Sequence, residues 1–233
     1  MGTEIEIHPV QATILRILLF KTEARFSELN KTELTNDHFT FHINQLLDLG
    51  LIEKNSGNKY QLTPKGKEFA NRMDTDKVAV ERQAKVGVCV VCIRSYKGKK
   101  QFLIQQRLKQ PYYGFHGFVT GKIHWGETAL GTAQRELKEE TGLEANLSLS
   151  GIEHKMDYSA DGKMLEDKFF FIFKGVNTKG DLIESFEGGK NIWYTEDDVK
   201  NLPNLFKDDL QIIETVKGDK LKFFENKFTE LTY

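Results

Sequence analysis

The spacing of hydrophobic residues divides the chain into two parts of different design. In the first part, apolar side chains recur at helical spacing, as in the segment 10–23, where Ile14, Leu15, Leu18 and Leu19 form one stripe. The second part contains continuous apolar runs, VGVCVVCI (86–93) and FFFIF (169–173), which are typical of buried strands. We therefore expect one domain over 1–73, a polar linker over 74–83 and a second domain over 84–233.

The N-terminal pattern predicts a helix, a short helix, a longer helix, a hairpin and a final helix. The longer helix begins at a Thr35 or Asn36 cap and ends at Gly50, and it carries Phe39, Ile43, Leu46 and Leu47 on one face. The turn NSGN (55–58) closes the hairpin, and Pro64 opens the last helix. This order, and the run FHINQLLDLGLIEKNSGNKYQLTPKGKEF, resemble the winged helix-turn-helix family over residues 8–72.

In that family the second long helix lies in a major groove of DNA and the hairpin contacts phosphates. The resemblance implies that the base-contacting residues are Asn36, His38, Thr40, His42 and Asn44, and that the phosphate contacts are Lys54, Lys59 and Lys65. Residues 1–73 hold nine Lys and Arg against nine Asp and Glu, however, and DNA binding depends on phosphate neutralisation. Duplex DNA binding and a role in protein contact or dimerisation therefore remain as alternatives.

The composition excludes several classes of protein. The chain has 33 basic and 34 acidic residues, so it is neither a basic nucleic-acid coat nor an acidic tail. It has no apolar run near the ~18 residues of a membrane span, and no secretory signal pattern. Cys89 and Cys92, three apart in a predicted strand, point to opposite faces and suit neither a zinc site nor a mutual disulfide. We expect a soluble, reduced, cytoplasmic protein.

A second helix pattern carries an unusual set of acidic residues. Thr128 can cap this helix and Gly142 can end it, with Ala129, Ala133 and Leu137 facing the core. Glu136, Glu139 and Glu140 then fall within an arc of about 100°. Three carboxylates on one stripe repel one another, and they are suitable ligands for Mg²⁺ or Mn²⁺. A solvated acidic face, partly neutralised by neighbouring cations, is the structural alternative.

The surrounding residues make that alternative the weaker one. The segment 121–143, GKIHWGETALGTAQRELKEETGL, has a Gly, Glu, Arg and Leu spacing that average composition would match about once in 10⁹ starting points. It resembles the Nudix box, and the likeness extends over about residues 80–220. The resemblance implies an α/β/α sandwich with a mixed sheet, which makes the whole chain α+β. It also implies hydrolysis of a nucleoside diphosphate linked to another moiety.

The resemblance also assigns roles to the residues of the box. Glu136 and Glu140 match the main metal ligands, Glu139 matches a ligand or the catalytic base, and the carbonyl of Thr120 matches a further metal contact. The residues that support the loop and helix are Gly121, Glu127, Arg135 and Gly142. Several members use one more glutamate from a later loop as metal ligand or base. Glu187 is the candidate here, with Glu184 as its alternative, and both can also be plain loop charges.

The substrate contacts are less well defined by the sequence. Arg107 ends a strand that leads toward the site and can hold a phosphate. Tyr112, Tyr113 and Phe115 can stack a base or ring, pack in the core or lie exposed on the surface. We expect Trp125 to pack on the helix. The strand 167–175 shows no evident chemistry. ADP-ribose, a dinucleotide, an oxidised nucleotide and a sugar nucleotide all remain open as substrates.

The sequence supports two functions of different classes. The first is a metal-dependent Nudix pyrophosphohydrolase, expected as a homodimer, whose winged helix binds DNA or serves assembly. The alternative is a DNA-binding transcription regulator whose Nudix domain only senses a ligand. Such regulators commonly place the winged helix after the Nudix part, and sensor domains tend to lose box carboxylates. The reversed order and the complete carboxylate set here favour the enzyme.

Overall fold

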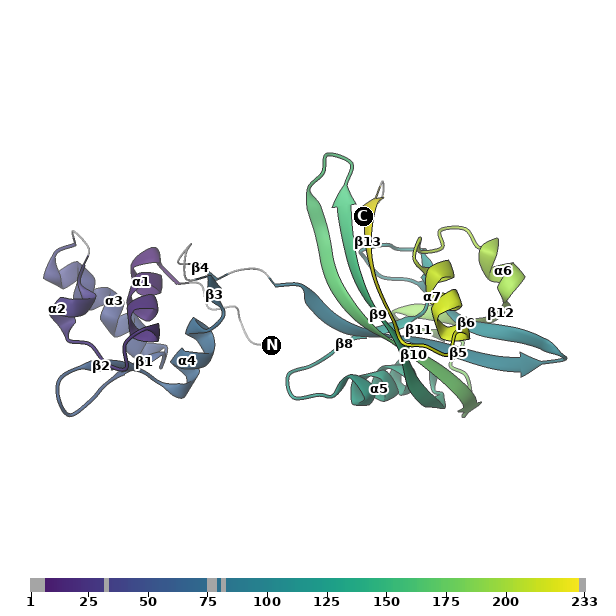
Figure 1. Ribbon diagram of the computed structural model, residues 1–233, viewed down its shortest axis with the longest axis horizontal. Coiled ribbons are helices and arrows are strands. Elements are labelled where there is room, and N and C mark those ends of the chain that lie inside the picture. The colour runs from purple at the N-terminus through teal and green to yellow at the C-terminus, as the bar shows by residue number, and fades with distance from the viewer. Residues whose placement is uncertain (1–6, 32–33, 75–78, 81–82, 231–233) are drawn as a thin grey trace. The chain divides into compact units, whose positions relative to one another are not determined.

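The chain forms two compact units, Met1–Arg82 and Gln83–Tyr233, in a computed structural model that describes residues 7–31, 34–74, 79–80 and 83–230 (Figure 1). Each unit has a hydrophobic core of its own. Among the described residues, no helix has the length and apolar character needed to cross a membrane.

The N-terminal unit has the element order expected of a winged helix-turn-helix. Its core gathers the apolar faces of the helices, and Phe39 and Leu46 are completely buried in it. Thr35 and Thr63 cap two of the helices, because their side chains accept hydrogen bonds from the backbone N–H groups of His38 and Gly66. The elements are α1 (Pro9–Leu19), α2 (Phe26–Leu29), α3 (Asn36–Asp48), β1 (Ile52–Lys54), β2 (Tyr60–Leu62) and α4 (Pro64–Ala70).

Part of the segment expected as a linker is structured. β3 (Met73–Asp74) pairs antiparallel with β4 (Ala79–Val80), and Met73 is buried in the N-terminal core. A single buried methionine at the end of a polar segment gives no periodic signal, so the sequence pattern did not show this pairing. Residues 75–78 and 81–82 of the expected linker lie outside the described residues.

The C-terminal unit is a mixed sheet between helices, which confirms the predicted α/β/α sandwich. The sheet order is β11-β12-β6-β5-β10-β9-β13, with β7 paired to β6 and β8 to β5. β10 runs parallel to β5, β13 runs parallel to β9, and the other pairs are antiparallel. The strands are β5 (Lys85–Tyr96), β6 (Lys99–Arg107), β7 (His116–Gly117), β8 (Val119–Lys122), β9 (Glu144–Ser159), β10 (Met164–Lys179), β11 (Ser185–Phe186), β12 (Gly189–Thr195) and β13 (Lys222–Glu230).

The helices α5 (Ala129–Thr141), α6 (Glu196–Lys200) and α7 (Asp209–Lys217) cover the two faces of this sheet (Figure 1). Alternate residues of β5 enter different cores. Cys92 lies in the cluster that contains Leu137 of α5, whereas Cys89 lies in the cluster that contains Ile212 of α7. The two cysteines therefore point to opposite faces of the sheet, as their spacing predicts.

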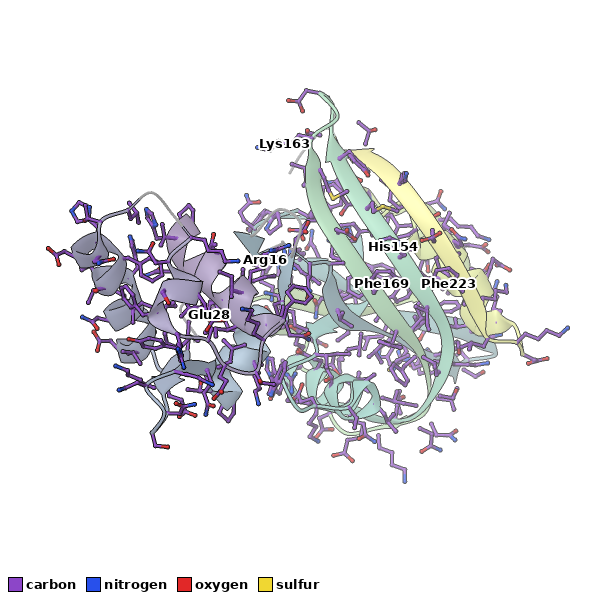
Figure 2. The ribbon with its side chains drawn as sticks, turned by 60° about the vertical axis from the view of Figure 1, so that its left-hand side comes forward. Arg16, Glu28, His154, Lys163, Phe169 and Phe223 are labelled. Carbon is purple, nitrogen blue, oxygen red and sulfur yellow. The ribbon has the colours of Figure 1, made fainter. Side chains whose placement is uncertain are left out.

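The long strands β9, β10 and β13 lie side by side, and their two faces differ in chemistry (Figure 2). On one face His154 stacks on Phe169 of β10, with ring centroids 4.1 Å apart. On the other face, alternate β9 residues carry charge yet are buried, namely Glu153, Lys155 and Asp157. This buried charged face lies on the α7 side of the sheet and contributes to the site described below.

Candidate active site

The segment 121–143 forms a strand end, a loop and the helix α5, with the caps that the sequence predicts. The Thr128 side chain accepts from the Gly131 N–H, and Gly142 ends the helix in the left-handed region at φ 72°. A Cβ atom on Gly121 would overlap the Glu136 side chain, so only glycine lets β8 approach α5 this closely. The strand end and the acidic stripe are thus brought into direct contact.

Glu127 and Arg135 join the loop to the helix. Arg135 Nε and Nη2 donate to the two Glu127 carboxylate oxygens at 2.8 and 3.0 Å. Glu127 also accepts from the His124 backbone N–H and from the Thr132 hydroxyl. These hydrogen bonds, the one from Arg135 first, lower the pKa of Glu127 to about 2. Glu127 is therefore ionised at any ordinary pH, and it keeps Arg135 in a fixed position.

The same guanidinium also contacts the acidic stripe. Its Nη1 donates to Glu136 at 2.9 Å and to Glu139 at 3.1 Å. Glu136 and Glu140 are largely shielded, with 13% of each side chain exposed, whereas 60% of the Glu139 side chain is exposed. The structure therefore separates the three carboxylates into a shielded pair, one helical turn apart, and a third that faces solvent.

Glu140 lies in a polar niche between α5 and the sheet. Gln105 Nε2 donates to its carboxylate at 3.0 Å, and Lys109 Nζ lies 3.9 Å from the other oxygen. Asn191 Nδ2 donates to the Glu140 backbone carbonyl at 2.7 Å. Burial nevertheless raises the pKa of Glu140, because these neighbours only partly replace the water it has lost. A cation beside this carboxylate would be stabilised.

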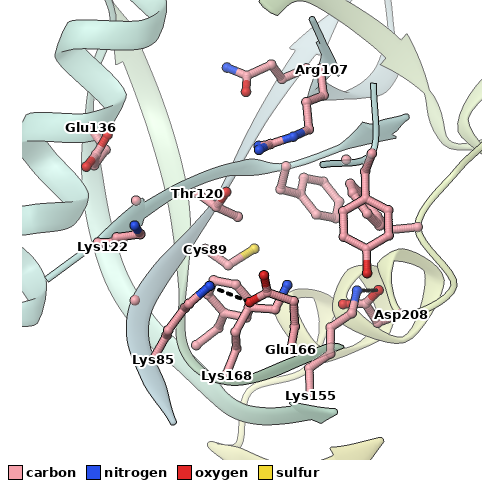
Figure 3. A pocket seen from close by; sticks show the side chains of 18 of the residues that line it. Lys85, Cys89, Arg107, Thr120, Lys122, Glu136, Lys155, Glu166, Lys168 and Asp208 are labelled. Carbon is pink, nitrogen blue, oxygen red and sulfur yellow. Dashed lines mark hydrogen bonds and ion pairs between the residues drawn. The ribbon is translucent and has the colours of Figure 1, made fainter. Parts of the chain in front are cut away.

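A pocket of about 530 Å³ opens beside this pair and runs from the acidic helix to the start of α7 (Figure 3). At one end it is lined by Glu136, Glu140 and Thr120. Several cations border it, namely Lys85, Arg107, Lys109, Lys122, Lys155 and Lys168. The far end is lined by the buried carboxyl groups of Glu153, Glu166, Asp208 and Asp209.

A model of the NUDIX domain matches residues 84–216, more than half of the chain and the whole of this site. The chain belongs to the Nudix family. The MutT protein from Bacillus halodurans is 26% identical, with a TM-score of 0.53 over 62% of this chain and 90% of that one. The Nudix domain of NrtR from Shewanella oneidensis, solved with ADP-ribose, is 19% identical, with a TM-score of 0.52 over 66% of this chain and 97% of that one. By family and fold, the C-terminal unit is a Nudix hydrolase.

Nudix enzymes generally use divalent metal ions, and the pocket contains two carboxylates that can hold one. Glu136 and Glu140 fit, because both are shielded carboxylates on one helix face that line the same pocket. In the residues described, however, no three His, Cys, Asp or Glu side chains are arranged to hold a metal ion together. The third donor expected from the Nudix box, Glu139, is turned toward solvent and bound to Arg135.

The predicted glutamate from the later loop is not placed at the pocket. Glu187 is exposed in the turn between β11 and β12, and Glu184 is exposed just before β11. Neither residue lines the pocket that contains Glu136 and Glu140. The prediction relied on the loop's position along the chain, whereas the direction of the loop depends on how β12 pairs with β6.

The aromatic residues before the Nudix box pack or lie on the surface, which are the alternatives to substrate stacking that the sequence left open. Tyr112 lines the pocket, but its hydroxyl donates to Asp157 at 3.1 Å and its side chain is buried. Phe115 packs against Tyr112 and Phe206 and does not line the pocket. Tyr113 is exposed away from the pocket. None of the three therefore presents a free ring to a substrate.

The prediction for Trp125 is wrong, whereas phosphate binding by Arg107 stays a prediction. Trp125 does not pack on α5, because 93% of it is exposed at the tip of the Nudix-box loop. Arg107 does line the pocket, but its Nε donates to the Pro111 carbonyl at 2.5 Å and its Nη2 to the Gln110 carbonyl at 3.2 Å. Burial lowers the pKa of Arg107, and part of its donor capacity orders this loop instead of facing substrate.

The sequence reasoning missed the charged residues at the far end of the pocket. Lys168 and Glu166 belong to a strand that had shown no evident chemistry, and Asp208 and Asp209 begin α7. The available signal was the alternation of charged residues at 153, 155 and 157. That alternation normally marks a solvated face, and only the covering helix and loop make it a buried one.

Some of the predicted DNA-contacting residues lie on the surface of the N-terminal unit, and others contact residues of the unit itself. His38, Thr40 and Asn44 are exposed on α3. His42 is half-buried and stacked on His8 at 4.5 Å between ring centroids, and this burial lowers its pKa. The Thr40 hydroxyl donates to the carbonyl of Asn36, one turn back.

The predicted phosphate contacts are similarly divided. Lys59 forms an ion pair with Glu23. Lys65 donates to the Leu49 carbonyl at the end of α3, at 2.7 Å. Lys54 is exposed, with its ammonium group over the Tyr60 ring. Packing or local pairing thus engages His42, Lys59 and Lys65, and DNA contact by these residues stays a prediction.

Proposed function

We propose that the C-terminal unit hydrolyses the diphosphate bond of a nucleoside diphosphate linked to a second moiety, with Mg²⁺ or Mn²⁺ held by Glu136 and Glu140. The observation that carries this proposal is the shielded carboxylate pair on one turn of α5, facing the same pocket as Arg107, Lys109 and Lys122. A diphosphate is a strong anion, so its binding needs both cationic side chains and a bridging metal ion.

The chain's own residues divide this work. Glu136 and Glu140 hold the cation, together with the carbonyl of Thr120, and Arg135 keeps Glu136 in position. A divalent cation supplies neutralisation of the phosphate oxygens and polarises water. Lys109, which already lies 3.9 Å from Glu140, is placed to contact a phosphate oxygen at the same point.

We assign the proton acceptor to Glu139. It shares the Arg135 Nη1 group with Glu136, so its carboxylate lies beside the shielded pair while staying open to water. Neither Glu139 nor Glu187, the other candidate, lines the pocket, but Glu139 shares a hydrogen-bond donor with the lining residue Glu136. Because a general base contributes about 10²–10⁴-fold, Glu139→Gln should lower kcat by that factor with little change in metal affinity.

The direct test is a substrate panel with the full chain. ADP-ribose, a dinucleoside polyphosphate, a nucleoside triphosphate and a sugar nucleotide are each assayed with Mg²⁺ or Mn²⁺, and the phosphate products are resolved. Glu140→Gln should remove most turnover at limiting metal while the protein stays folded. Glu144→Gln is the matched control, because Glu144 is 70% exposed and pairs only with Lys138 in the described structure. Equal activity of the two variants would refute the ligand assignment.

For the N-terminal unit, we favour a role in contact between protein chains over duplex DNA binding. The unit has no net charge over residues 1–73, and Lys59 and Lys65 are engaged within it. The outward face of α3 instead exposes Phe41, 58% accessible. Light scattering should show a dimer that Phe41→Ser weakens, and a selection from random duplex DNA at low salt should enrich no sequence. Enrichment of a palindrome with a monomeric protein would reverse this assignment.

A further inference from the structure

The end of the pocket farthest from Glu136 and Glu140 is polar and charged, and it is formed by cross-strand pairing. Lys168 of β10 lies opposite Lys155 of β9 and opposite Lys85 of β5. Glu153 lies opposite Phe170 in the same way. We call this region the polar end, and we define it as Lys85, Glu153, Lys155, Glu166, Lys168, Asp208 and Asp209.

Each lysine of the polar end has an acidic partner. Lys155 donates to Asp208 at 2.7 Å, and Lys85 to Glu166 at 2.6 Å (Figure 3). Lys168 Nζ lies 3.3 Å from Asp157, which is buried beside the pocket. Because these charges are matched in pairs, the region offers little net charge to attract a further phosphate.

Two carboxyl groups remain outside this pairing. Glu153 is 0% exposed and Asp209 is 3% exposed. Within the described structure, Glu153 Oε2 and Asp209 Oδ2 have no hydrogen-bond partner, although both residues line the pocket. Burying a polar atom without a partner costs about 1–3 kcal/mol, which a ligand that supplies the partner would recover. The unpartnered atoms therefore point to a ligand with several hydrogen-bonding groups.

The protonation of these two groups narrows the choice of ligand. Burial, followed by the nearby Asp208 carboxylate, raises the pKa of Glu153 to about 8 and raises that of Asp209 as well. At neutral pH Glu153 is therefore a neutral carboxylic acid, with one O–H donor and acceptor capacity. A neutral group that both donates and accepts suits such acids better than a cation or an anion does.

Two aromatic rings beside this end, those of Phe206 and Tyr112, are not open for stacking. Lys155 Nζ lies 4.7 Å above the centre of the Phe206 ring, and Lys168 Nζ lies 5.7 Å above that of Tyr112. The two rings contact each other edge to face at 5.3 Å. A Cβ on Gly117 would approach Phe206 within 2.7 Å, so the backbone packs closely on that ring too. A planar base would lack a stacking surface on these two rings.

We infer that the polar end binds a polyhydroxylated group, the sugar of a nucleoside diphosphate sugar whose diphosphate lies at Glu136 and Glu140. This inference rests on the proposed function and specifies its second moiety. A sugar hydroxyl donates and accepts at once, so it can serve the unpartnered oxygens of Glu153 and Asp209 together with the lysines. The half-buried Phe170 ring is available beneath the apolar face of the sugar.

Binding is measured by calorimetry with the full chain and Ca²⁺ in place of Mg²⁺, so that the diphosphate still has a bridging cation while hydrolysis is slow. ADP-ribose and ADP are compared, since they differ only by the terminal ribose on the β-phosphate. We expect ADP-ribose to bind at least about 10-fold more tightly, because a hydroxyl in a built site satisfies buried polar atoms. Glu153→Met, similar in volume but apolar, should remove this preference, and Glu153→Gln should retain part of it.

The control and the contrary outcomes separate this inference from the proposed function. Glu214→Gln, an exposed change on α7, should leave both affinities unchanged. If Glu153→Met weakens ADP and ADP-ribose by the same factor, the polar end binds the base, and the sugar assignment is wrong. Equal binding of both ligands by the wild type would also overturn it. Sugar-dependent binding without hydrolysis in Mg²⁺ would instead leave this inference standing and refute the proposed catalysis.

Discussion

Replacement of Glu153 by glutamine should make the C-terminal unit more stable, and increasingly so as the pH rises. Glu153 is completely buried on β9, and its folded-state pKa is about 8 against an ordinary value of 4.5. Burial is the main cause, and the Asp208 carboxylate adds to it, whereas Lys155 and a hydrogen bond from Asn226 act in the opposite direction. Glutamine has nearly the shape of the protonated acid but no proton to lose.

The size and sign follow from proton linkage. Below pH 4.5 both the folded and the unfolded chain hold the Glu153 proton, so wild type and variant should differ little. Between pH 4.5 and about 8 the folded state keeps the proton and the unfolded state releases it. The wild-type free energy of unfolding therefore falls by about 1.4 kcal/mol per pH unit relative to the variant. At pH 7 the accumulated difference is about 3 kcal/mol.

The two tryptophans make this measurable in the full chain. Trp125 and Trp193 both lie in the C-terminal unit, so tryptophan fluorescence during urea unfolding reports on that unit alone. Unfolding curves for wild type and Glu153→Gln are compared from pH 5 to pH 8. Asp209 and the other buried acids contribute equally to both proteins and cancel in the difference.

The control is Glu214→Gln, which removes one exposed carboxylate from α7 and should show no pH-dependent difference. Parallel curves of unfolding free energy against pH for wild type and Glu153→Gln would refute the reasoning. That result would mean that Glu153 is ionised in the folded state at neutral pH, and that the polar end carries more negative charge than its burial implies.

Three further predictions follow from particular contacts. Arg135→Lys keeps the charge but cannot bond both oxygens of Glu127 while contacting the acidic stripe. The value of kcat/KM should therefore fall about 10–100-fold, and unchanged kinetics would contradict the positioning role of Arg135. Burial raises the pKa of Cys92 to about 12, so about one thiol in 10⁴ is ionised at pH 8. Iodoacetamide should therefore label Cys92 only after unfolding, and rapid labelling of the native protein would contradict this prediction. Because Lys59 and Lys65 are engaged within the N-terminal unit, any duplex DNA binding should depend weakly on salt, and a logarithmic slope steeper than about −5 would show several free phosphate contacts.

The sequence by itself determined the parts of this protein that depend on local spacing. The caps of α5 at Thr128 and Gly142, and the acidic stripe, follow from helical geometry over a few residues, whereas the shielding of Glu136 and Glu140 comes from the sheet beside the helix. Glu127 and Arg135 are only eight positions apart, so this ion pair forms within the same short segment by which the family is recognised. The order of elements in both units could likewise be predicted, because periodicity and turn residues are local signals.

Only the tertiary structure decided which charged strand residues become buried and meet. Lys155, Lys168 and Asp208 are far apart in the chain, and they come together through strand register and the placement of α7. An alternating charged strand looks the same in sequence whether its polar face is solvated or covered. The directions of the loops that carry Glu187 and Trp125 were equally out of reach, since a loop is oriented by the elements that anchor it. The box was therefore predictable and the polar end was not, because the first depends on contacts within one helix and the second on contacts between distant strands.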